Sequence, residues 1–290
     1  AHPYRGGLAA MNERLARELT ERGDEVVIYN FTLQYPGFLF PGKSQYTDET
    51  VPQGLRIIRK INSVNPFNWL KVGRELRKIC PDLIIVKYWL PFMGPALGTI
   101  VRLARRNRHT RVICIADNMI PHEKRPGDRL FTKYFTKGVD GYIAMSHEVY
   151  ADIEKLVAHP LRRFTPHPIY DHYGEIMPRE EALKLLQLDP DYRYLLFFGF
   201  IRDYKGLDWL IRAMAEPQLK DRQIRLIVAG EFYSDSEPYL KLIRELGLEE
   251  KVILHTDYIP DVLINRYFGA ADLVVQPYKT ATQSGVTQIG

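Results

Sequence analysis

Apolar runs of strand length alternate with helix-period segments along almost the whole chain, and this alternation limits the fold more than any other feature. Continuous apolar strands joined by helices are typical of parallel sheets that are covered on both faces. The sequence therefore predicts an α/β fold of the doubly wound, Rossmann-like type. The strand-like runs in the first half of the chain are 26–31, 83–89, 111–116 and 141–146.

A looser segment interrupts this alternation and indicates a boundary between two domains. The stretch 159–178, HPLRRFTPHPIYDHYGEIMP, contains four prolines and three histidines, a composition typical of a crossing segment. Further strand-like runs at 194–200, 224–232, 251–256 and 273–278 then alternate with helical patterns. We therefore predict a first domain over residues 1–165 and a second over residues 166–290.

Both domains are expected to be incomplete. The chain opens on AHPYRGGLAA, a glycine loop leading into a helix, without the strand that normally begins a doubly wound domain. It stops in TATQSGVTQIG, where a loop is expected to pass into a helix.

The composition indicates packed globular domains. Hydrophobic residues make up 46% of the chain and aromatic residues 12%, which argues against disorder. Cys80 and Cys114 show no metal-like spacing, so we expect two buried thiols in a reducing cytosol. No apolar run approaches the roughly 18 residues that a membrane-spanning helix needs.

The charge is divided unevenly between the two domains. Residues 1–170 contain 26 Lys and Arg against 16 Asp and Glu, whereas residues 171–290 contain 14 against 19. A net charge of +10 in the first part is compatible with an anionic lipid, an anionic acceptor or nucleic acid as partner. Ordinary surface charge explains it equally well.

The junction FFGFIRDYKGLDWLI, 197–211, is the most informative motif. A strand ends near Gly199, Arg202 and Lys205 follow, and a helix begins after Gly206. The N-terminus of a helix favours phosphate, arginine offers a planar fork of donors, and glycine allows the backbone to come close. We predict a phosphate site here, and a merely solvated loop is the alternative.

Two loops of the first domain also precede helices. Gly6 and Gly7 open a helix and could bring the backbone near an anion, although paired glycines are often only a turn. Asp117 and His122 follow a strand, with Glu123 beside them, and suit general-base work or hydroxyl positioning. The alternative is that Asp117 caps a turn and His122 lies on the surface. A zinc site is not expected, because no paired Cys and His spacing occurs.

Other loops of the second domain carry polar groups where strands end. Ser284, Gly285 and Val286 could present backbone N–H groups to phosphate, and Glu231 could accept a hydrogen bond from a base or a ribose. Tyr258 lies in a similar loop, 256–261. Each signal is weak alone, but ligands in open α/β sheets bind at these strand ends.

The ordered set FFGFIRDYKGLDWLI, IVAGEF, VILHTDYIPD, YFGAADLVVQPY and TQSGVTQIG resembles the donor-binding domain of family 4 glycosyltransferases with the GT-B fold. YRGGLAAMNERLARELTERGDEVVIY is similar to the first loop and helix of that family. The resemblance covers nearly the whole chain. It implies two Rossmann-like domains facing a cleft, the first for the acceptor and the second for a nucleotide-sugar.

The resemblance also implies the chemistry. The sugar would be transferred with retention of configuration, with no metal and no cofactor, and Arg202 and Lys205 would stabilise the nucleoside diphosphate leaving group. Gly6 and Gly7 would lie near the same phosphates or the acceptor. Ser284, Gly285 and Val286 would contribute backbone contacts to phosphate.

Two positions depart from the family pattern. The family often has two glutamates in its last motif, and these positions correspond to Thr282 and Gly290 here. The residue that holds the donor ribose is therefore unassigned. Many members place a histidine where this sequence has Asp117, so the acceptor-side residue is open between Asp117 and His122.

The resemblance implies a cytoplasmic protein with a glycan or lipid-linked acceptor. Family members often act at the inner face of the cytoplasmic membrane, and the basic first domain agrees with peripheral contact to anionic lipid. The segments 35–43 and 65–78 combine apolar and basic residues that could insert shallowly. Lining of the acceptor site or ordinary core packing would explain them as well.

Three other functions compete with this interpretation. A non-hydrolysing sugar-nucleotide epimerase on the same fold would need further catalytic carboxylates and histidines. A non-enzymatic two-domain sugar-binding protein would leave Arg202 and Lys205 without a role. A nucleic-acid partner is suggested only by the isoelectric point near 9.0, and no motif supports it, so we predict none.

Overall fold

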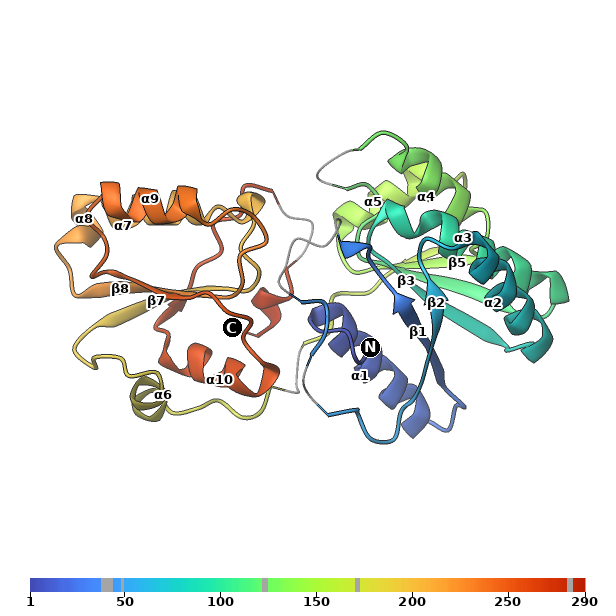
Figure 1. The fold of residues 1–290 in the computed structure, drawn as a ribbon, viewed down its shortest axis with the longest axis horizontal. Coiled ribbons are helices and arrows are strands. Elements are labelled where there is room, and N and C mark those ends of the chain that lie inside the picture. The colour runs from blue at the N-terminus through green and yellow to red at the C-terminus, as the bar shows by residue number, and fades with distance from the viewer. Residues whose placement is uncertain (38–43, 48–49, 122–124, 170–172, 281–283, 290) are drawn as a thin grey trace. The chain divides into compact units, whose positions relative to one another are not determined.

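Two units of parallel α/β structure make up the protein (Figure 1). They comprise Ala1–His167 (unit 1) and Pro168–Gly290 (unit 2), and the division expected from the sequence lies two residues earlier. The computed structural model describes residues 1–37, 44–47, 50–121, 125–169, 173–280 and 284–289.

Unit 1 alternates strands and helices around parallel sheets. β1 pairs with β2, and a separate four-stranded sheet has the order β3-β4-β5-β6. Its elements are α1 (Gly7–Glu21), β1 (Val27–Leu33), β2 (Arg56–Asn62), α2 (Pro66–Ile79), β3 (Leu83–Tyr88), α3 (Gly94–Ala104), β4 (Arg111–Ala116), α4 (Asp128–Thr136), β5 (Gly141–Ala144), α5 (His147–Leu156) and β6 (Arg162–Phe164).

Two of the described helices of unit 1 begin after residues whose side chains accept hydrogen bonds from the free N–H groups of the first turn. Ser146 caps α5 by accepting a hydrogen bond from the backbone N–H of Val149 at 3.2 Å. Asn65 caps α2 in the same way, and Pro66 occupies its first turn, where the missing N–H has no cost. Apolar periodicity in the sequence predicts a helix over 69–80, and the cap at Asn65 begins the helix three residues earlier.

The expectation of two buried thiols is wrong for one of them. Cys114 lies in β4 and is fully buried, but Cys80 is exposed and ends α2 in a left-handed conformation with φ of 57°. Burial raises the pKa of the Cys114 thiol far above its usual range. Apolar neighbours in the sequence do not bury Cys80, because it follows the last turn of the helix.

Unit 2 is one four-stranded parallel sheet with the order β10-β7-β8-β9. In Figure 1, α7, α8 and α9 lie on one side of this sheet, and α6 and α10 lie on the other. The elements are α6 (Arg179–Leu185), β7 (Arg193–Phe198), α7 (Leu207–Met214), α8 (Pro217–Lys220), β8 (Ile224–Ala229), α9 (Glu237–Glu245), β9 (Val252–His255), α10 (Asp261–Ala270) and β10 (Leu273–Val274).

Each face of the unit 2 sheet has its own apolar core, because successive strand residues point to opposite faces. Phe197 and Val228 pack toward α7 and α9. Leu196 and Ile227 pack toward α6 and α10. This explains the continuous apolar strands of the sequence and agrees with the predicted fold class.

Three elements differ from the sequence pattern. β2 was not expected, since RIIRKIN mixes charged and apolar residues and pairs only along β1. β6, a three-residue strand, lies inside the segment expected to cross between domains. β10 was expected over 273–278 but pairs only through Leu273 and Val274. Pro277 lacks the N–H that a longer strand would need.

In the described part of the chain, no helix is both long and apolar enough to cross a membrane.

The contact between α2 and α3 depends on Gly73, and we expect Gly73→Ala to destabilise unit 1 by about 1–3 kcal/mol. A Cβ at this position would lie 2.8 Å from Cβ of Leu103 and 3.1 Å from the backbone oxygen of Ile100. Thermal unfolding followed by circular dichroism would measure the loss. Gly37→Ala is the control, because no atom of the described residues lies within 4 Å of the corresponding position there. An unchanged midpoint for Gly73→Ala would contradict this view of the helix contact.

Candidate functional site

The strand order of unit 2 places two loops side by side at the carboxyl end of its sheet. The chain runs from β7 through β8 to β9 on one side, and β10 then pairs with the other edge of β7. In open α/β sheets, ligands bind where the connections diverge in this way. The loops after β7 and β10 contain most of the residues of unit 2 that the sequence singled out.

Lys205 is a buried cation in the first of these loops. It ends a 3-10 turn, Asp203–Lys205, and only 8% of its surface is exposed. No ion pair joins it to a carboxylate of the described residues. Burial, and secondarily the charge of Arg202, lowers the pKa of Lys205 to about 8. An amine kept charged in these surroundings is a strong site for an anion.

Glycines leave the space that this amine occupies. Gly199 has φ of 94°, and a Cβ there would lie 3.1 Å from Nζ of Lys205. Gly230, with φ of 138°, follows β8, and a Cβ there would lie 2.3 Å from the backbone oxygen of Gly199. Any side chain at either position would displace the loop or the amine.

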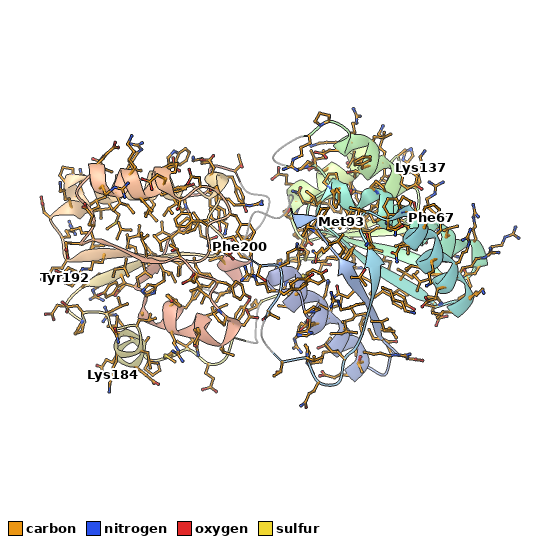
Figure 2. All side chains as sticks on the ribbon, in the orientation of Figure 1. Phe67, Met93, Lys137, Lys184, Tyr192 and Phe200 are labelled. Carbon is orange, nitrogen blue, oxygen red and sulfur yellow. The ribbon has the colours of Figure 1, made fainter. Side chains whose placement is uncertain are left out.

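Arg202 is exposed and lies beside aromatic rings that follow the neighbouring strands. Its guanidinium is 5.5 Å from the ring centre of Tyr233. Phe200, labelled in Figure 2, packs on Tyr233 with ring centres 4.1 Å apart. Tyr258, from the loop after β9, stacks on Phe200 at 6.5 Å. The structure therefore links Arg202 to Tyr258 through two rings that the sequence analysis did not select.

The loop after β10 meets Lys205 from the other side. The ring of Tyr278 lies 5.6 Å from Nζ of Lys205, and its hydroxyl is 3.2 Å from Oγ of Ser284. A side-chain atom of Val286 lies 3.7 Å from the position that a Cβ on Gly199 would take. Gly285 precedes a 3-10 turn, Val286–Gln288, where the sequence indicated the start of a helix.

Glu231 is also placed at this edge but is turned inward. Its side chain is 2% exposed, and its backbone oxygen accepts a hydrogen bond from the N–H of Ile201 at 2.8 Å. The backbone of Glu231 thus fixes the start of the loop that carries Arg202.

These residues form one cationic site in unit 2. The buried amine, the exposed guanidinium and the backbone around Gly199 together suit the oxygens of a diphosphate. Sequence reasoning found both cations because they follow an apolar strand. It missed Tyr278, Tyr233 and Phe200, since aromatic residues beside a strand are more often core.

In unit 1, Gly6 and Gly7 open α1 as expected. Gly6 has φ of 92° and precedes the first residue of the helix, and no side chain of the described residues caps this end. The N–H of Ala9 donates to the backbone oxygen of Gly6 at 2.9 Å, which leaves the N–H groups of Gly7 and Leu8 available to an anion.

Asp117 is engaged in a buried ion pair that the sequence did not indicate. Lys87, near the end of β3, places Nζ 2.8 Å from Oδ1 of Asp117, which directly follows β4. The amine also contacts Sδ of Met11 in α1 at 2.7 Å. The side chains of Lys87 and Asp117 are only 6% and 14% exposed. A lysine inside the apolar run LIIVKYW was the signal that could have revealed this pair.

Four of the candidate positions, His122, Glu123, Thr282 and Gly290, lie outside the described residues. Over the described ranges, no group of three or more His, Cys, Asp and Glu side chains could hold a metal ion.

Comparison with known proteins gives one consistent result for both units. Residues 5–166 match the model of Glycosyltransferase Family 4, and residues 192–288 match that of Glycosyl transferases group 1. A D-inositol 3-phosphate glycosyltransferase of Thermobifida fusca is 25% identical over 94% of this chain and 67% of its own length.

Solved structures show the same fold. Sucrose-phosphate synthase of Thermosynechococcus elongatus superposes with a TM-score of 0.69 at 18% identity, over 97% of this chain and 72% of its own. Anabaena HepE in complex with UDP and glucose gives a TM-score of 0.59 at 17% identity, over 76% of this chain and 59% of its own. These are GT-B glycosyltransferases, so the predicted fold class is confirmed.

The buried charge of Lys205 destabilises the fold, and we therefore expect Lys205→Met to raise the free energy of unfolding. The lowered pKa means that burial of the charged amine is unfavourable by at most about 3 kcal/mol. A gain of about 1–3 kcal/mol is expected from urea unfolding at pH 7. This gain in the free energy of unfolding should shrink between pH 8 and 10.5, because the amine of the folded wild-type protein is then neutral and its burial no longer destabilises the fold. Lys184→Met on α6, which removes an exposed amine, is the control. A lower free energy of unfolding in Lys205→Met would contradict the conclusion that Lys205 is a buried cation without an ion pair among the described residues.

Proposed function

We propose, since the chain belongs to glycosyltransferase family 4, that it transfers a sugar from a nucleoside-diphosphate sugar with retention of anomeric configuration and without a metal ion. Glycosyltransferase activity follows from the family and from its similar proteins. The class of sugar donor, the stereochemistry of the transfer and the class of acceptor are our proposals.

The buried amine of Lys205 carries the proposal. A cation that lacks an ion pair in the described structure is maintained at a cost, and such sites are often functional. Arg202 adds a second positive charge from the same loop. Together they would bind the two phosphates of the donor at the point where the strand order reverses.

The same two cations suit the transition state. When the bond between sugar and diphosphate breaks, negative charge develops on the leaving phosphate. The fixed positive charges of Arg202 and Lys205 would stabilise that charge more than the ground state. This is the work that a divalent metal does in other phosphate chemistry, so no metal ion is required.

Aromatic rings beside Arg202 offer a surface for the base of the donor. HepE, which shares the fold, was solved with UDP and glucose, and this supports a nucleoside diphosphate in the present protein. The rings of Phe200, Tyr233 and Tyr258 lie beside Arg202 and offer flat apolar surface for a base. Stacking accepts every base and therefore does not choose among uridine, guanosine and adenosine.

On the acceptor side, Asp117 is proposed to accept a hydrogen bond from the attacking hydroxyl of a glycan or lipid-linked acceptor. The amine of Lys87 lies 2.8 Å from Oδ1 of Asp117, and carboxylate oxygens are hydrogen-bond acceptors. An epimerase and a non-enzymatic sugar-binding protein are not favoured, because both units match glycosyltransferase models.

Calorimetric titration with UDP, GDP and ADP tests the donor site. We expect one nucleoside diphosphate to bind the wild-type protein, and we expect Arg202→Ala combined with Lys205→Met to weaken binding at least 100-fold. Each lost charge-assisted contact is worth about 1.5–3 kcal/mol. Affinity should also fall as the pH rises from 7 to 9, because Lys205 loses its charge near pH 8.

Lys184→Met and Arg212→Ala, which remove exposed cations of unit 2 outside these loops, are the matched control. Binding that survives in the Arg202 and Lys205 variant, or no binding of any of the three nucleotides to wild type, would refute the donor site.

Peripheral contact with an anionic membrane is a further part of the proposal. Phe67, Lys71, Arg74 and Lys78 recur every three or four residues and form an exposed stripe on α2. Phe67, labelled in Figure 2, is 83% exposed. The three cations have no ion-pair partner among the described residues. The other segment suggested by the sequence, 35–43, lies largely outside the described residues.

Sedimentation with vesicles of phosphatidylcholine and phosphatidylglycerol tests this contact. We expect Lys71→Ala, Arg74→Ala and Lys78→Ala together to weaken binding at least ten-fold, since each cation near an anionic surface contributes about 1 kcal/mol. Removal of three exposed cations from unit 2, Lys184, Arg212 and Lys220, should leave vesicle binding unchanged. Equal losses in both triple variants would show that only total charge matters.

A further inference from the structure

The loop that carries the two donor-site cations also carries two acids. Asp203 follows Arg202 directly, and Asp208 lies in the first turn of α7. The segment 202–208 therefore holds two positive and two negative side chains and has no net charge. By itself it would be a weak site for a diphosphate, because each nearby carboxylate repels the ligand.

Lys279, from the loop after β10, pairs with both of these acids. Its amine is 2.7 Å from Oδ1 of Asp203 and 3.0 Å from Oδ1 of Asp208. It also lies 5.6 Å from the ring centre of Trp209. The hydrogen bond to Asp203 is the main cause that raises the pKa of Lys279 above its usual value. The amine is thus engaged by protein groups and remains charged at neutral pH.

The backbone of Lys279 joins the same two loops. Its N–H donates a hydrogen bond of 2.7 Å to the backbone oxygen of Tyr204. Close by, Gly206 has φ of 71°, and a Cβ there would lie 2.1 Å from the backbone oxygen of Pro277. The loops after β7 and β10 are therefore in direct backbone contact, and they hold Lys205 and Tyr278 on facing sides.

We propose that Lys279 is a positioning residue of the donor site, which neutralises Asp203 and Asp208 and fixes the loop after β10 against the loop of Arg202 and Lys205. The inference rests on the proposed function for the identity of the donor. Lys279 does not bind the diphosphate itself, because its amine is held by the two carboxylates. Counting Lys279, the charged groups of the two loops sum to +1, and this net charge acts on the ligand.

Three variants separate the effect of the positive charge of Lys279 from the effect of its side-chain packing. Lys279→Met keeps an apolar stem over Trp209 but leaves the two carboxylates unpaired beside the cations. Lys279→Arg keeps the charge. Lys279→Met with Asp203→Asn and Asp208→Asn removes all three charges, so that the loop returns to a net positive charge through Arg202 and Lys205 alone.

Inorganic pyrophosphate is the probe, because it reports on the cationic site without a base or a sugar. Its affinity for the whole protein is measured by calorimetry at two salt concentrations, with unfolding midpoints recorded for every variant. We expect Lys279→Met to weaken pyrophosphate binding five- to fifty-fold, and we expect Lys279→Arg to stay within two-fold of wild type. The triple variant should recover to within about three-fold of wild type.

Recovery in the triple variant would establish the electrostatic role, because a merely structural lysine would not be rescued by removal of its partners. Unchanged binding in Lys279→Met, or the absence of recovery in a folded triple variant, would overturn the inference. Should Lys279→Met fail to fold, Asp203→Asn with Lys279 intact is expected to tighten binding at least two-fold, and unchanged or weaker binding would overturn the inference.

Wild-type protein that binds pyrophosphate but none of the three nucleotides would refute the proposed function alone. Wild-type protein that does not bind pyrophosphate would overturn the inference.

Discussion

The buried charge of Lys205 is the interaction on which the organisation of unit 2 depends. A lysine amine with 8% exposure and no ion pair in the described structure must find its compensation elsewhere. The surrounding backbone is shaped around it, with glycines at 199 and 230 in conformations that side chains rarely adopt. Stability is given up at this point, and an anionic ligand is the partner that would restore it.

The strand order explains why that charge lies where a ligand can reach it. Because β10 returns to the free edge of β7, two connections leave the sheet in opposite directions at the same end. One brings the cations, and the other brings Tyr278, Ser284 and Lys279. Neither loop forms the site alone. The direct backbone contact between the two loops holds their residues together in one site. The proposed donor site is therefore a property of the sheet topology as much as of any single residue.

Sequence reasoning reached the fold class, and it selected both cations of the proposed donor site, because local patterns determine them. Continuous apolar strands, the cap at Ser146 and a cationic turn after a strand are all visible over a few residues. It missed β2, since RIIRKIN resembles neither an alternating nor a buried strand and forms only through pairing with β1. Lys87 with Asp117, and Lys279 with Asp203, are pairs separated by 30 and 76 residues. No local pattern reports which of many charges will meet, because that depends on tertiary packing.

The left-handed residue at the end of α2 has a practical consequence. Cys80 is exposed, whereas Cys114, the only other cysteine of the sequence, is fully buried with a thiol that resists ionisation. Thiolate reactivity requires both access and ionisation. A maleimide dye should therefore attach at one defined place without any engineered cysteine. Placed at the end of the helix that carries the Phe67 stripe, that dye would report on the polarity of whatever surface this face of the protein meets.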